Sequence, residues 1–259
     1  MTTSDSLVTL EINNAVALLT LNNPPLNLVT LSLSRELRSL LKQLDRDDDV
    51  RVVVLTGSGK KAFCVGSDIK EFPEVWDDVI SKKLQKENET FNAIEFLNKP
   101  VIAALEGVVC GGGFEMAMAC DMRILSDSGK IALPEINLGV FPGSGGLFRL
   151  PKLVGTAKAM ELMMTGSFVE AKRCLEWGMV NRLAPAGTTV EAALELAREI
   201  ALKPFEAIRL IKQGVRAIGM QSTEHCFYQN LRFSQEIFQT RDCAEGVAAF
   251  LEKREAKFL

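Results

Sequence analysis

The architecture of this chain is set by the segment Val101-Ile-Ala-Ala-Leu-Glu-Gly-Val-Val-Cys-Gly-Gly-Gly-Phe-Glu-Met-Ala-Met-Ala119. Its first five residues form a short apolar run of the kind that is typical of a strand buried on both faces. A glycine-rich turn follows and opens a helix at about Gly112, since glycine permits the sharp backbone conformations that such a turn requires. We therefore predict a buried strand that is followed, after a glycine-rich turn, by a helix.

Further strands and helices flank this segment on both sides. Short apolar runs at Val52–Leu55 and Met122–Leu125 predict two more buried strands, while residues 33–44 and 78–97 have helical patterns. An alternating pattern near the N-terminus predicts strands there as well. Because strands and helices alternate to about residue 182, the sequence indicates an α/β fold built from βαβ units.

The C-terminal part of the chain follows a different pattern, which is helical only from Val190 onward. We expect about four helices there, separated at three helix breakers: Pro204, Gly214 and Gly219. The chain is accordingly divided into a core that carries the candidate site, residues 1–195, and a helical oligomerisation region, residues 196–259. The apolar faces of these late helices need a partner surface, which favours self-association.

Composition is that of a globular protein. The chain has 259 residues, of which 47% are hydrophobic and 24% charged, and its formal net charge is −3. This charge argues against a nucleic-acid partner, since duplex binding normally requires a basic excess. Two glutamates and several glycines interrupt the apolar stretch 101–120, so a membrane span is not expected. Six cysteines without a CxxC pair, and no visible secretory signal, predict reduced thiols in a cytoplasmic protein.

Several common chemistries lack the residues that they require. Residues 57–60 resemble a phosphate-binding loop, but Val54 and Lys61 stand where the Walker pattern needs glycine and Ser or Thr. Residues 142–146 resemble a nucleophile elbow, but the first is proline instead of glycine. His225, the single histidine, lies in a late helical pattern, and without CxxC pairs no metal site is expected.

Three glycine-bearing segments remain, and each follows a predicted strand: residues 60–70, 108–115 and 133–146. In the second, the first N–H groups of a helix have no intrahelical acceptor and favour a developing negative charge. Glu115 lies in the first turn of that helix, and Glu135 stands in the third segment between two apolar stretches. The two carboxyl groups are therefore candidates for acid–base chemistry beside an anion-stabilising turn.

Each glutamate also has an ordinary structural interpretation when its segment is taken alone. Glu115 then stabilises the first turn of its helix, where the helix dipole favours a negative side chain. Glu135 then pairs with an arginine such as Arg123 or Arg149. The functional interpretation depends on the occurrence of all three segments together, in this order.

The three segments resemble the signature of the crotonase superfamily, whose members act on acyl-CoA thioesters. The resemblance covers nearly the whole chain and includes the dipeptide Leu26-Asn27 and the tail Thr240-Arg-Asp-Cys-Ala-Glu-Gly-Val-Ala-Ala-Phe250, which continues to Arg254. It implies an α/β fold that is a crotonase-like spiral of ββα units with a helical C-terminal extension. It also implies that subunits assemble into a homotrimer or a dimer of trimers.

The same resemblance implies roles for individual residues. The backbone N–H groups of Ser67 and Gly112 would form an oxyanion hole for the thioester carbonyl. The family usually has alanine at the first of these positions, but the main chain supplies the donor, so serine is compatible. Glu115 would orient water and Glu135 would donate a proton to C2. Six further residues are expected to contact the substrate, with the lysines near the CoA phosphates: Leu26, Lys61, Asp68, Ile69, Lys70 and Gly111.

Some of these expectations have plain alternatives. Lys61 and Lys70 also read as solvated surface charges. By analogy of position, three aromatic residues are expected in the wall of the acyl pocket, with core packing as the alternative: Phe72, Trp76 and Phe141.

The presence of both glutamates favours hydration, the reversible addition of water across the C2–C3 double bond of a 2-enoyl-CoA. No cofactor is expected beyond the coenzyme A that forms part of the substrate. An isomerase that moves the double bond between C3 and C2, or a hydratase of cyclic dienoyl-CoA, is the alternative on the same scaffold. A non-enzymatic RNA-binding relative is a further alternative, which the mild acidity of the chain disfavours.

Overall fold

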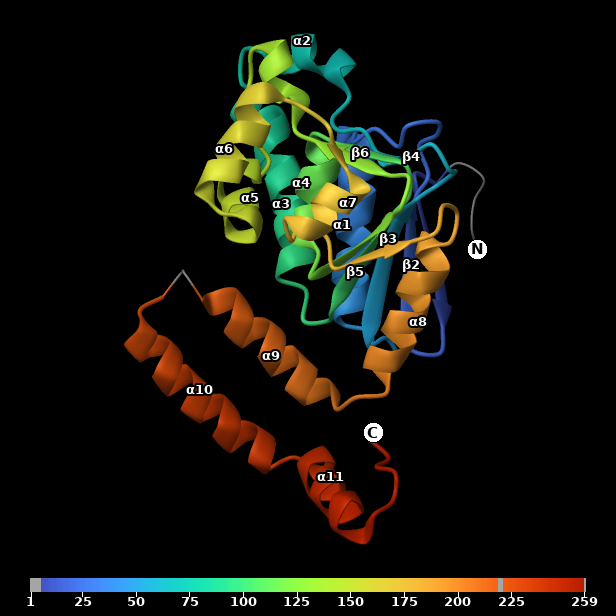
Figure 1. Ribbon diagram of the computed structural model, residues 1–259, viewed down its shortest axis with the longest axis vertical. Helices are drawn as coiled ribbons and strands as arrows, with labels where there is room; N and C mark the ends of the chain where they lie inside the picture. The colour runs from blue at the N-terminus through green and yellow to red at the C-terminus, as the bar shows by residue number, and fades with distance from the viewer. Residues whose placement is uncertain (1–5, 219–220, 259) are drawn as a thin grey trace.

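The computed structural model describes residues 6–218 and 221–258 (Figure 1). Its larger sheet has the strand order β1-β2-β3-β5-β7-β10. The β1–β2 pair is antiparallel, and the other neighbouring strands are parallel. The strands have these bounds: β1 Val8–Asn13, β2 Val16–Leu21, β3 Val52–Gly57, β5 Val101–Leu105, β7 Met122–Ser126 and β10 Arg182–Ala184.

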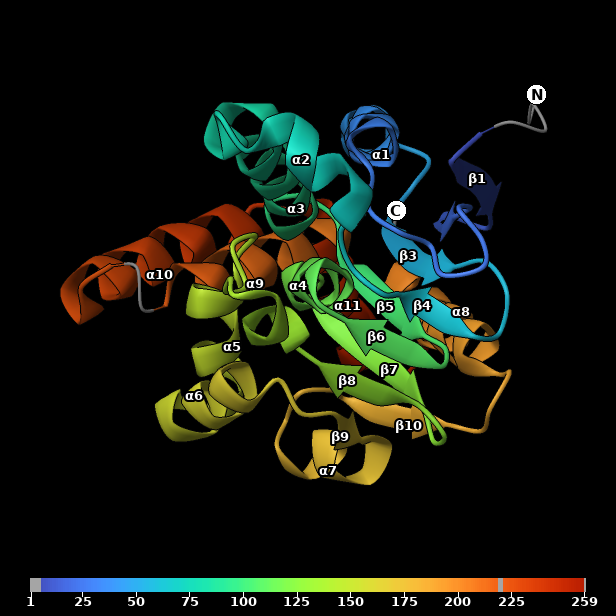
Figure 2. The ribbon, with the colours of Figure 1, turned by 90° about the horizontal axis from the view of Figure 1, so that it is seen from above.

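A smaller sheet lies beside it and has the order β4-β6-β8-β9. Its strands are short: β4 Ala62–Cys64, β6 Val108–Cys110, β8 Lys130–Ala132 and β9 Val169–Glu170. Strands β4, β6 and β8 each follow a strand of the larger sheet directly and precede a helical segment, so the chain repeats a ββα unit (Figure 2). The sequence predicted the longer strands, but these short ones carry too few residues for a recognisable pattern.

Helices surround the two sheets. The helix predicted from the leucine pattern and the helix predicted after the triple glycine are both present, and residues 78–97 contain a π-helical turn that continues as an α-helix. The bounds are: α1 Leu31–Asp45, η1 Ile69–Glu71, α2 Phe72–Val75, η2 Ile80–Leu84, α3 Gln85–Glu95, α4 Gly112–Ala119, η3 Pro134–Leu138, α5 Gly146–Val154, α6 Thr156–Thr165, α7 Ala171–Glu176 and α8 Thr189–Ala201.

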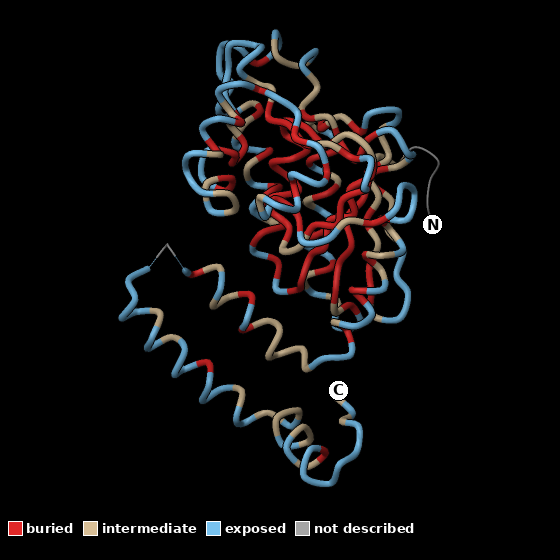
Figure 3. Tube along the Cα trace, viewed as in Figure 1, coloured by how far each residue is buried: buried red, intermediate tan, exposed pale blue. Residues whose placement is uncertain are grey.

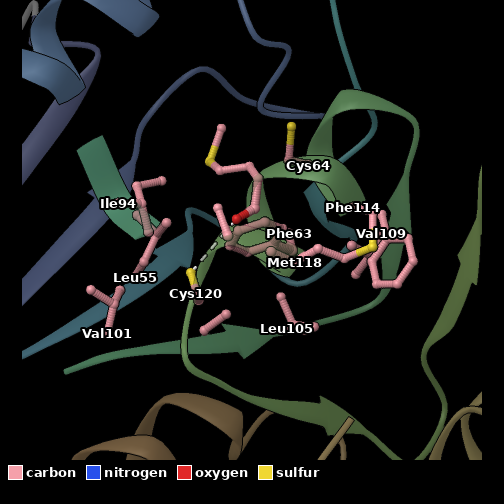
Figure 4. Packing of buried hydrophobic residues seen from close by; sticks show 14 of the residues in the cluster. Leu55, Phe63, Cys64, Ile94, Val101, Leu105, Val109, Phe114, Met118 and Cys120 are labelled. Atoms are coloured by element: carbon pink, nitrogen blue, oxygen red, sulfur yellow. Dashed lines mark hydrogen bonds between the residues drawn. The ribbon is translucent and has the colours of Figure 1, made fainter. Parts of the chain in front are cut away.

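Both faces of the larger sheet are buried, which explains why its strands read as continuous apolar runs. Val53 and Leu55 of β3 point into the main core, whereas Val52 and Val54 point toward α8 on the other face. Figure 3 shows that the buried residues are concentrated in the main body of the molecule and are few in the C-terminal helices. The molecule therefore has a layered core, and Figure 4 shows labelled members of its main cluster.

Helix α4 is the most enclosed helix of this core. All of its residues from Gly112 to Ala119 are buried, and it contacts β4, β6, α3 and α5. Phe63 of β4 and both Phe114 and Met118 of α4 belong to the same cluster. A helix that is apolar on all sides is stable only when it is surrounded in this way.

The C-terminal helices α9 Phe205–Ala217, α10 Thr223–Phe238 and α11 Arg241–Glu252 extend away from the core (Figure 1). Pro204 precedes α9, so the predicted break there is confirmed. The break predicted at Gly214 is wrong, because Gly214 lies inside α9, where the ring of Phe233 packs against its backbone. Gly219 lies outside the described residues. A further break occurs before Thr240, which caps α11.

The predicted boundary at residues 195 and 196 falls within α8, whose last residue, Ala201, still packs on the sheet. The division into a core and an oligomerisation region stays a prediction. Among the described helices, none is long and apolar enough to cross a membrane.

The close packing of α4 against β4 can be tested at Gly113 of α4, with Gly214 of α9 as a control glycine in another helix. A Cβ at Gly113 would lie 2.3 Å from the backbone oxygen of Cys64, whereas a Cβ at Gly214 would meet only the Phe233 ring at 3.7 Å. We expect Gly113→Ala to lower the free energy of unfolding by about 3 kcal/mol or more, since neither backbone can move aside. Gly214→Ala should be neutral or stabilising by about 0.5–1 kcal/mol, because alanine favours helix. Urea unfolding curves of both variants check this, and equal shifts would contradict it.

Candidate active site

Two backbone N–H groups lie side by side where the first two glycine-bearing segments meet. A Cβ on Gly112 would lie 3.4 Å from the nitrogen of Ser67, and a Cβ on Gly66 would lie 3.2 Å from the nitrogen of Gly112. Gly66 has a φ of +101° and Gly111 one of +55°, and both values favour glycine. The segments therefore approach one another closely, and the Ser67 hydroxyl oxygen lies 3.2 Å from the Cβ position of Gly112.

Neither N–H group is used within the local hydrogen-bonding pattern. The neighbours of Ser67 are paired, since Val65 N–H donates to Leu26 O at 3.1 Å and Asp68 N–H to Val29 O at 3.0 Å. No described residue accepts a hydrogen bond from Ser67 N–H. Gly112 begins α4, and the first N–H groups of a helix have no intrahelical acceptor. Both N–H groups are therefore without an acceptor among the described residues.

Asn27 holds the chain that runs beside Ser67. Its buried side chain donates to the backbone oxygens of Ser58 at 3.0 Å and Ala62 at 3.1 Å and accepts from Ser58 Oγ at 3.0 Å. Its own φ is +52°, a conformation that asparagine adopts more readily than most residues. The asparagine of the Leu26-Asn27 dipeptide is therefore structural, a role that sequence reasoning did not assign.

Glu115 lies in the first turn of α4, as predicted, and its side chain is buried. Its Oε1 atom accepts hydrogen bonds from the backbone N–H groups of Ser144 and Gly146, both at 2.8 Å. The pKa of this carboxyl group is raised to about 8, mainly by burial and also by the nearby Glu135 and Glu87, and the backbone donors oppose the rise. The group is therefore a buried acid that titrates near neutral pH.

Glu135 lies in η3 and faces the glycine turn that precedes α4. Its Oε1 atom lies 3.1 Å from the Cβ position of Gly111, and its Oε2 atom is buried without a hydrogen-bond partner among the described residues. Burial also raises the pKa of this carboxyl group. A buried polar atom without a partner is rare in proteins, so this oxygen is positioned to contact a ligand.

The arginine partners considered for Glu135 are engaged elsewhere. Arg123 donates to the backbone oxygens of Met179 and Cys120, and Arg149 pairs with Glu95. The interpretation of Glu135 as a member of an ion pair with either arginine is therefore wrong.

The loop that carries the Ser144 and Gly146 donors is held by helix α3. Asn88 Nδ2 donates to the Gly143 oxygen at 3.1 Å, and Ser144 Oγ donates to Glu87 Oε2 at 2.9 Å. Arg149 adds a hydrogen bond from its guanidinium to the Ser144 oxygen at 3.0 Å. Sequence reasoning missed these residues. The available signal was Glu87 itself, a charged residue at helical spacing from the apolar Phe91 and Ile94.

Most of the other residues expected to contact substrate are more exposed than the two glutamates. Asp68 caps η1 by accepting from Lys70 N–H at 3.0 Å. Lys61 and Lys70 are exposed, Ile69 is 55% exposed and Leu26 is 40% exposed. Their contacts with a ligand stay predictions.

The three aromatic residues proposed for the acyl pocket are not packed in the core. Trp76 is 77% exposed and Phe141 is 62% exposed, while Phe72 is half-buried. Core packing is therefore excluded for Trp76 and Phe141, and their part in a pocket wall stays a prediction.

Comparisons with known proteins agree over the length of the chain. The enoyl-CoA hydratase/isomerase family model matches residues 11–259. A probable enoyl-CoA hydratase of Bacillus subtilis is 37% identical, with 97% of this chain and 98% of that protein covered. A carnitinyl-CoA dehydratase of Proteus mirabilis is also 37% identical, with 90% and 91% covered. The crystal structure of an enoyl-CoA hydratase from Bacillus anthracis superposes with a TM-score of 0.94 at 33% identity, covering 98% of this chain and 99% of that one.

The raised pKa of Glu115 makes stability depend on pH. Its folded-state value of about 8 exceeds the ordinary 4.5, so the stability it contributes is complete below pH 4.5 and is lost as pH rises through 8. Ionisation then costs on the order of 4 kcal/mol.

Glu115→Gln cannot ionise, so we expect its unfolding free energy to rise relative to the unsubstituted protein between about pH 6 and about pH 9. Denaturant unfolding at both pH values measures this difference. The exposed Glu89, whose pKa is lowered by hydrogen bonds from Gln85 and Arg38, provides the control Glu89→Gln. A pH-independent effect of Glu115→Gln would contradict the expected titration.

Proposed function

Because this chain belongs to the enoyl-CoA hydratase/isomerase family and is an enzyme of that type, we propose that it adds water across the C2–C3 double bond of a 2-enoyl-CoA thioester. The observation that carries this proposal is the position of two backbone N–H groups, those of Ser67 and Gly112, which have no acceptor among the described residues, beside two carboxyl groups, that of the buried Glu115 and that of the half-buried Glu135. No cofactor is proposed beyond the coenzyme A of the substrate.

The two amides are proposed to act on the thioester carbonyl. When water adds at C3, negative charge develops on the carbonyl oxygen as an enolate-like state. Fixed N–H donors in a site shielded from water stabilise this charge, and each such donor changes the rate by about 10²–10³-fold in comparable enzymes. The donors at positions 67 and 112 belong to the main chain, so a serine in place of the usual alanine leaves both in place.

The two carboxyl groups are proposed to move the protons. Glu115 takes a proton from the water that attacks C3 while it is ionised, and the two backbone N–H groups that donate to its Oε1 atom stabilise this ionised form. Glu135 gives its proton to C2 through the carboxyl oxygen that has no partner. One proton is taken from water and one is delivered to C2, so the net change is the addition of H₂O. The raised pKa of Glu135 keeps that proton available.

A second candidate reaction is dehydration of a 3-hydroxyacyl-CoA, the same chemistry in reverse. The similarity to a carnitinyl-CoA dehydratase at 37% identity favours it, because that relative is named for water removal. Isomerisation of the double bond and hydration of a cyclic dienoyl-CoA use the same groups. Product identification with a panel of thioesters separates these reactions.

Self-association through the C-terminal helices is part of the proposal. Their exposed faces carry large apolar side chains, such as Val215, which is 62% exposed, Phe238 at 78% and Phe250 at 82%. Apolar surface of this extent normally meets another protein surface. We propose a homotrimer or a dimer of trimers, which sedimentation analysis distinguishes. The net charge is −3, so the chain lacks the excess of basic residues that would support the RNA-binding alternative.

The activity is tested with crotonyl-CoA, whose conjugated double bond absorbs light until water is added. We expect the absorbance to fall with the unsubstituted protein. Glu115→Gln and Glu135→Gln should each lower kcat by about 10²-fold or more, because each removes a proton-transfer group. The exposed Glu89→Gln variant serves as the control, with unchanged turnover. Full activity in both active-site variants would refute the assignment of this pair.

A further inference from the structure

A buried ion pair lies behind the proposed oxyanion hole and has no part in the mechanism above. Lys83 of η2 and Glu87 of α3 are four residues apart, their charged atoms are 3.0 Å apart, and each side chain is only 1% exposed. Lys83 also pairs with Glu71 at 2.7 Å. Removing two charges from water is costly and brings little net stability, so such a pair calls for an explanation other than packing.

The contacts of Glu87 reach both halves of the site. Ser67 Oγ donates to this carboxylate, at 2.9 Å from Oε1 and 3.1 Å from Oε2, and Ser144 Oγ donates to Oε2 at 2.9 Å. Ser67 carries one of the two unpaired N–H groups, and the N–H of Ser144 donates to Glu115. The Glu87 carboxylate therefore connects Ser67, which carries one proposed oxyanion donor, to the loop that donates to Glu115, the proposed base.

Resting on the proposed function, we propose that Glu87, held by Lys83, is a positioning residue that fixes Ser67 and Ser144 and so aligns the oxyanion donor with the Glu115 carboxyl group. The Ser67 hydroxyl group therefore has a role of its own in this proposal. Serine there is not a neutral replacement for alanine, because its Oγ is the atom through which Glu87 holds the segment. Hydrogen bonds to charged acceptors are short and strong, which suits them to fixing a loop.

The charge of Lys83 is the second part of this proposal. An unneutralised Glu87 would oppose the negative charge that develops on the thioester oxygen beside Ser67, since like charges repel strongly away from water. Lys83 offsets part of that charge, because its ammonium group pairs with Glu87 as well as with Glu71. The other acidic groups that face this cluster are Glu71, which shares Lys83, and Glu115. Lys83 therefore allows a carboxylate at position 87, where an unpaired carboxylate would slow the reaction.

Three single substitutions test the positioning role: Ser67→Ala, Ser144→Ala and Glu87→Gln. Each keeps both backbone donors, so a side chain without a role here would leave kcat unchanged. We expect kcat for crotonyl-CoA to fall about tenfold in each, with little change in KM, as for the loss of one hydrogen bond to a charged group. Ser126→Ala, which removes a buried hydroxyl group bonded to Ser128, and Glu89→Gln are the matched controls. Unchanged kcat in all three test variants would overturn the positioning role.

The charge argument is tested by a comparison of single and double substitutions. Lys83→Met leaves Glu87 unneutralised, so we expect a larger loss of kcat than in Glu87→Gln. The double variant Lys83→Met/Glu87→Gln should recover part of that loss, because it removes the carboxylate charge closest to Ser67 and leaves only that of Glu71 without Lys83. A purely structural pair gives the opposite order, with the double variant no better than Lys83→Met. Lys82→Met, at a lysine that pairs with Asp77 on the surface, controls for the change of residue type.

An infrared measurement separates failure of this inference from failure of the proposed function. The C=O stretching band of bound butyryl-CoA, a saturated thioester, reports polarisation of the carbonyl without turnover. We expect the band to shift to lower frequency in the unsubstituted protein and to return toward the value for free thioester in Ser67→Ala and Glu87→Gln. Absence of turnover with every enoyl-CoA would refute the proposed function, but the infrared comparison of the variants could still be made. An equal shift in all variants would overturn the inference, even in an active enzyme.

Discussion

The close approach of the buried helix α4 to strand β4 is the constraint on which the rest of the structure depends. At Gly113 a single methyl group would lie 2.3 Å from the backbone oxygen of Cys64, so the two segments meet main chain to main chain. The same closeness brings the start of α4 beside Ser67. It also encloses Glu115, in the first turn of α4, where burial raises the pKa of its carboxyl group.

Buried charges on α3 complete the site, since this helix holds the loop that α4 faces. Glu95 pairs with Arg149, which donates to the Ser144 oxygen, and also with Arg216 of α9 at 2.9 Å. A chain of ion pairs and hydrogen bonds therefore runs from the C-terminal helices to the backbone donors of Glu115. The polar groups of this region satisfy one another, whereas Glu135 keeps an oxygen without a partner among the described residues, and a substrate can use it.

Membership of the enoyl-CoA hydratase/isomerase family and the crotonase-like spiral of ββα units, both expected from the sequence, are confirmed. The exact reaction is a matter for experiment, because hydration, dehydration and isomerisation require the same two elements: donors for a thioester oxygen and groups that exchange protons at neighbouring carbons. Their difference lies in the acyl group that the pocket admits and in the proton that each carboxyl group carries. The proposed roles of Glu115 and Glu135 rest on their different environments, since Glu115 accepts from two backbone donors of another loop and Glu135 has one oxygen without a partner among the described residues.

The sequence by itself determined the buried strands, the glycine turn that opens α4 and the three segments from which the family was identified, because each is a local pattern of apolar and glycine residues. It did not reveal that Gly214 lies inside a helix, or that the Phe233 ring of another helix lies next to it. Nor did it reveal Glu87, whose partners Ser67 and Ser144 lie 20 and 57 residues away in the chain. Only the tertiary structure decided these contacts, because a buried carboxylate takes its partners from whichever segments the fold brings within hydrogen-bond distance.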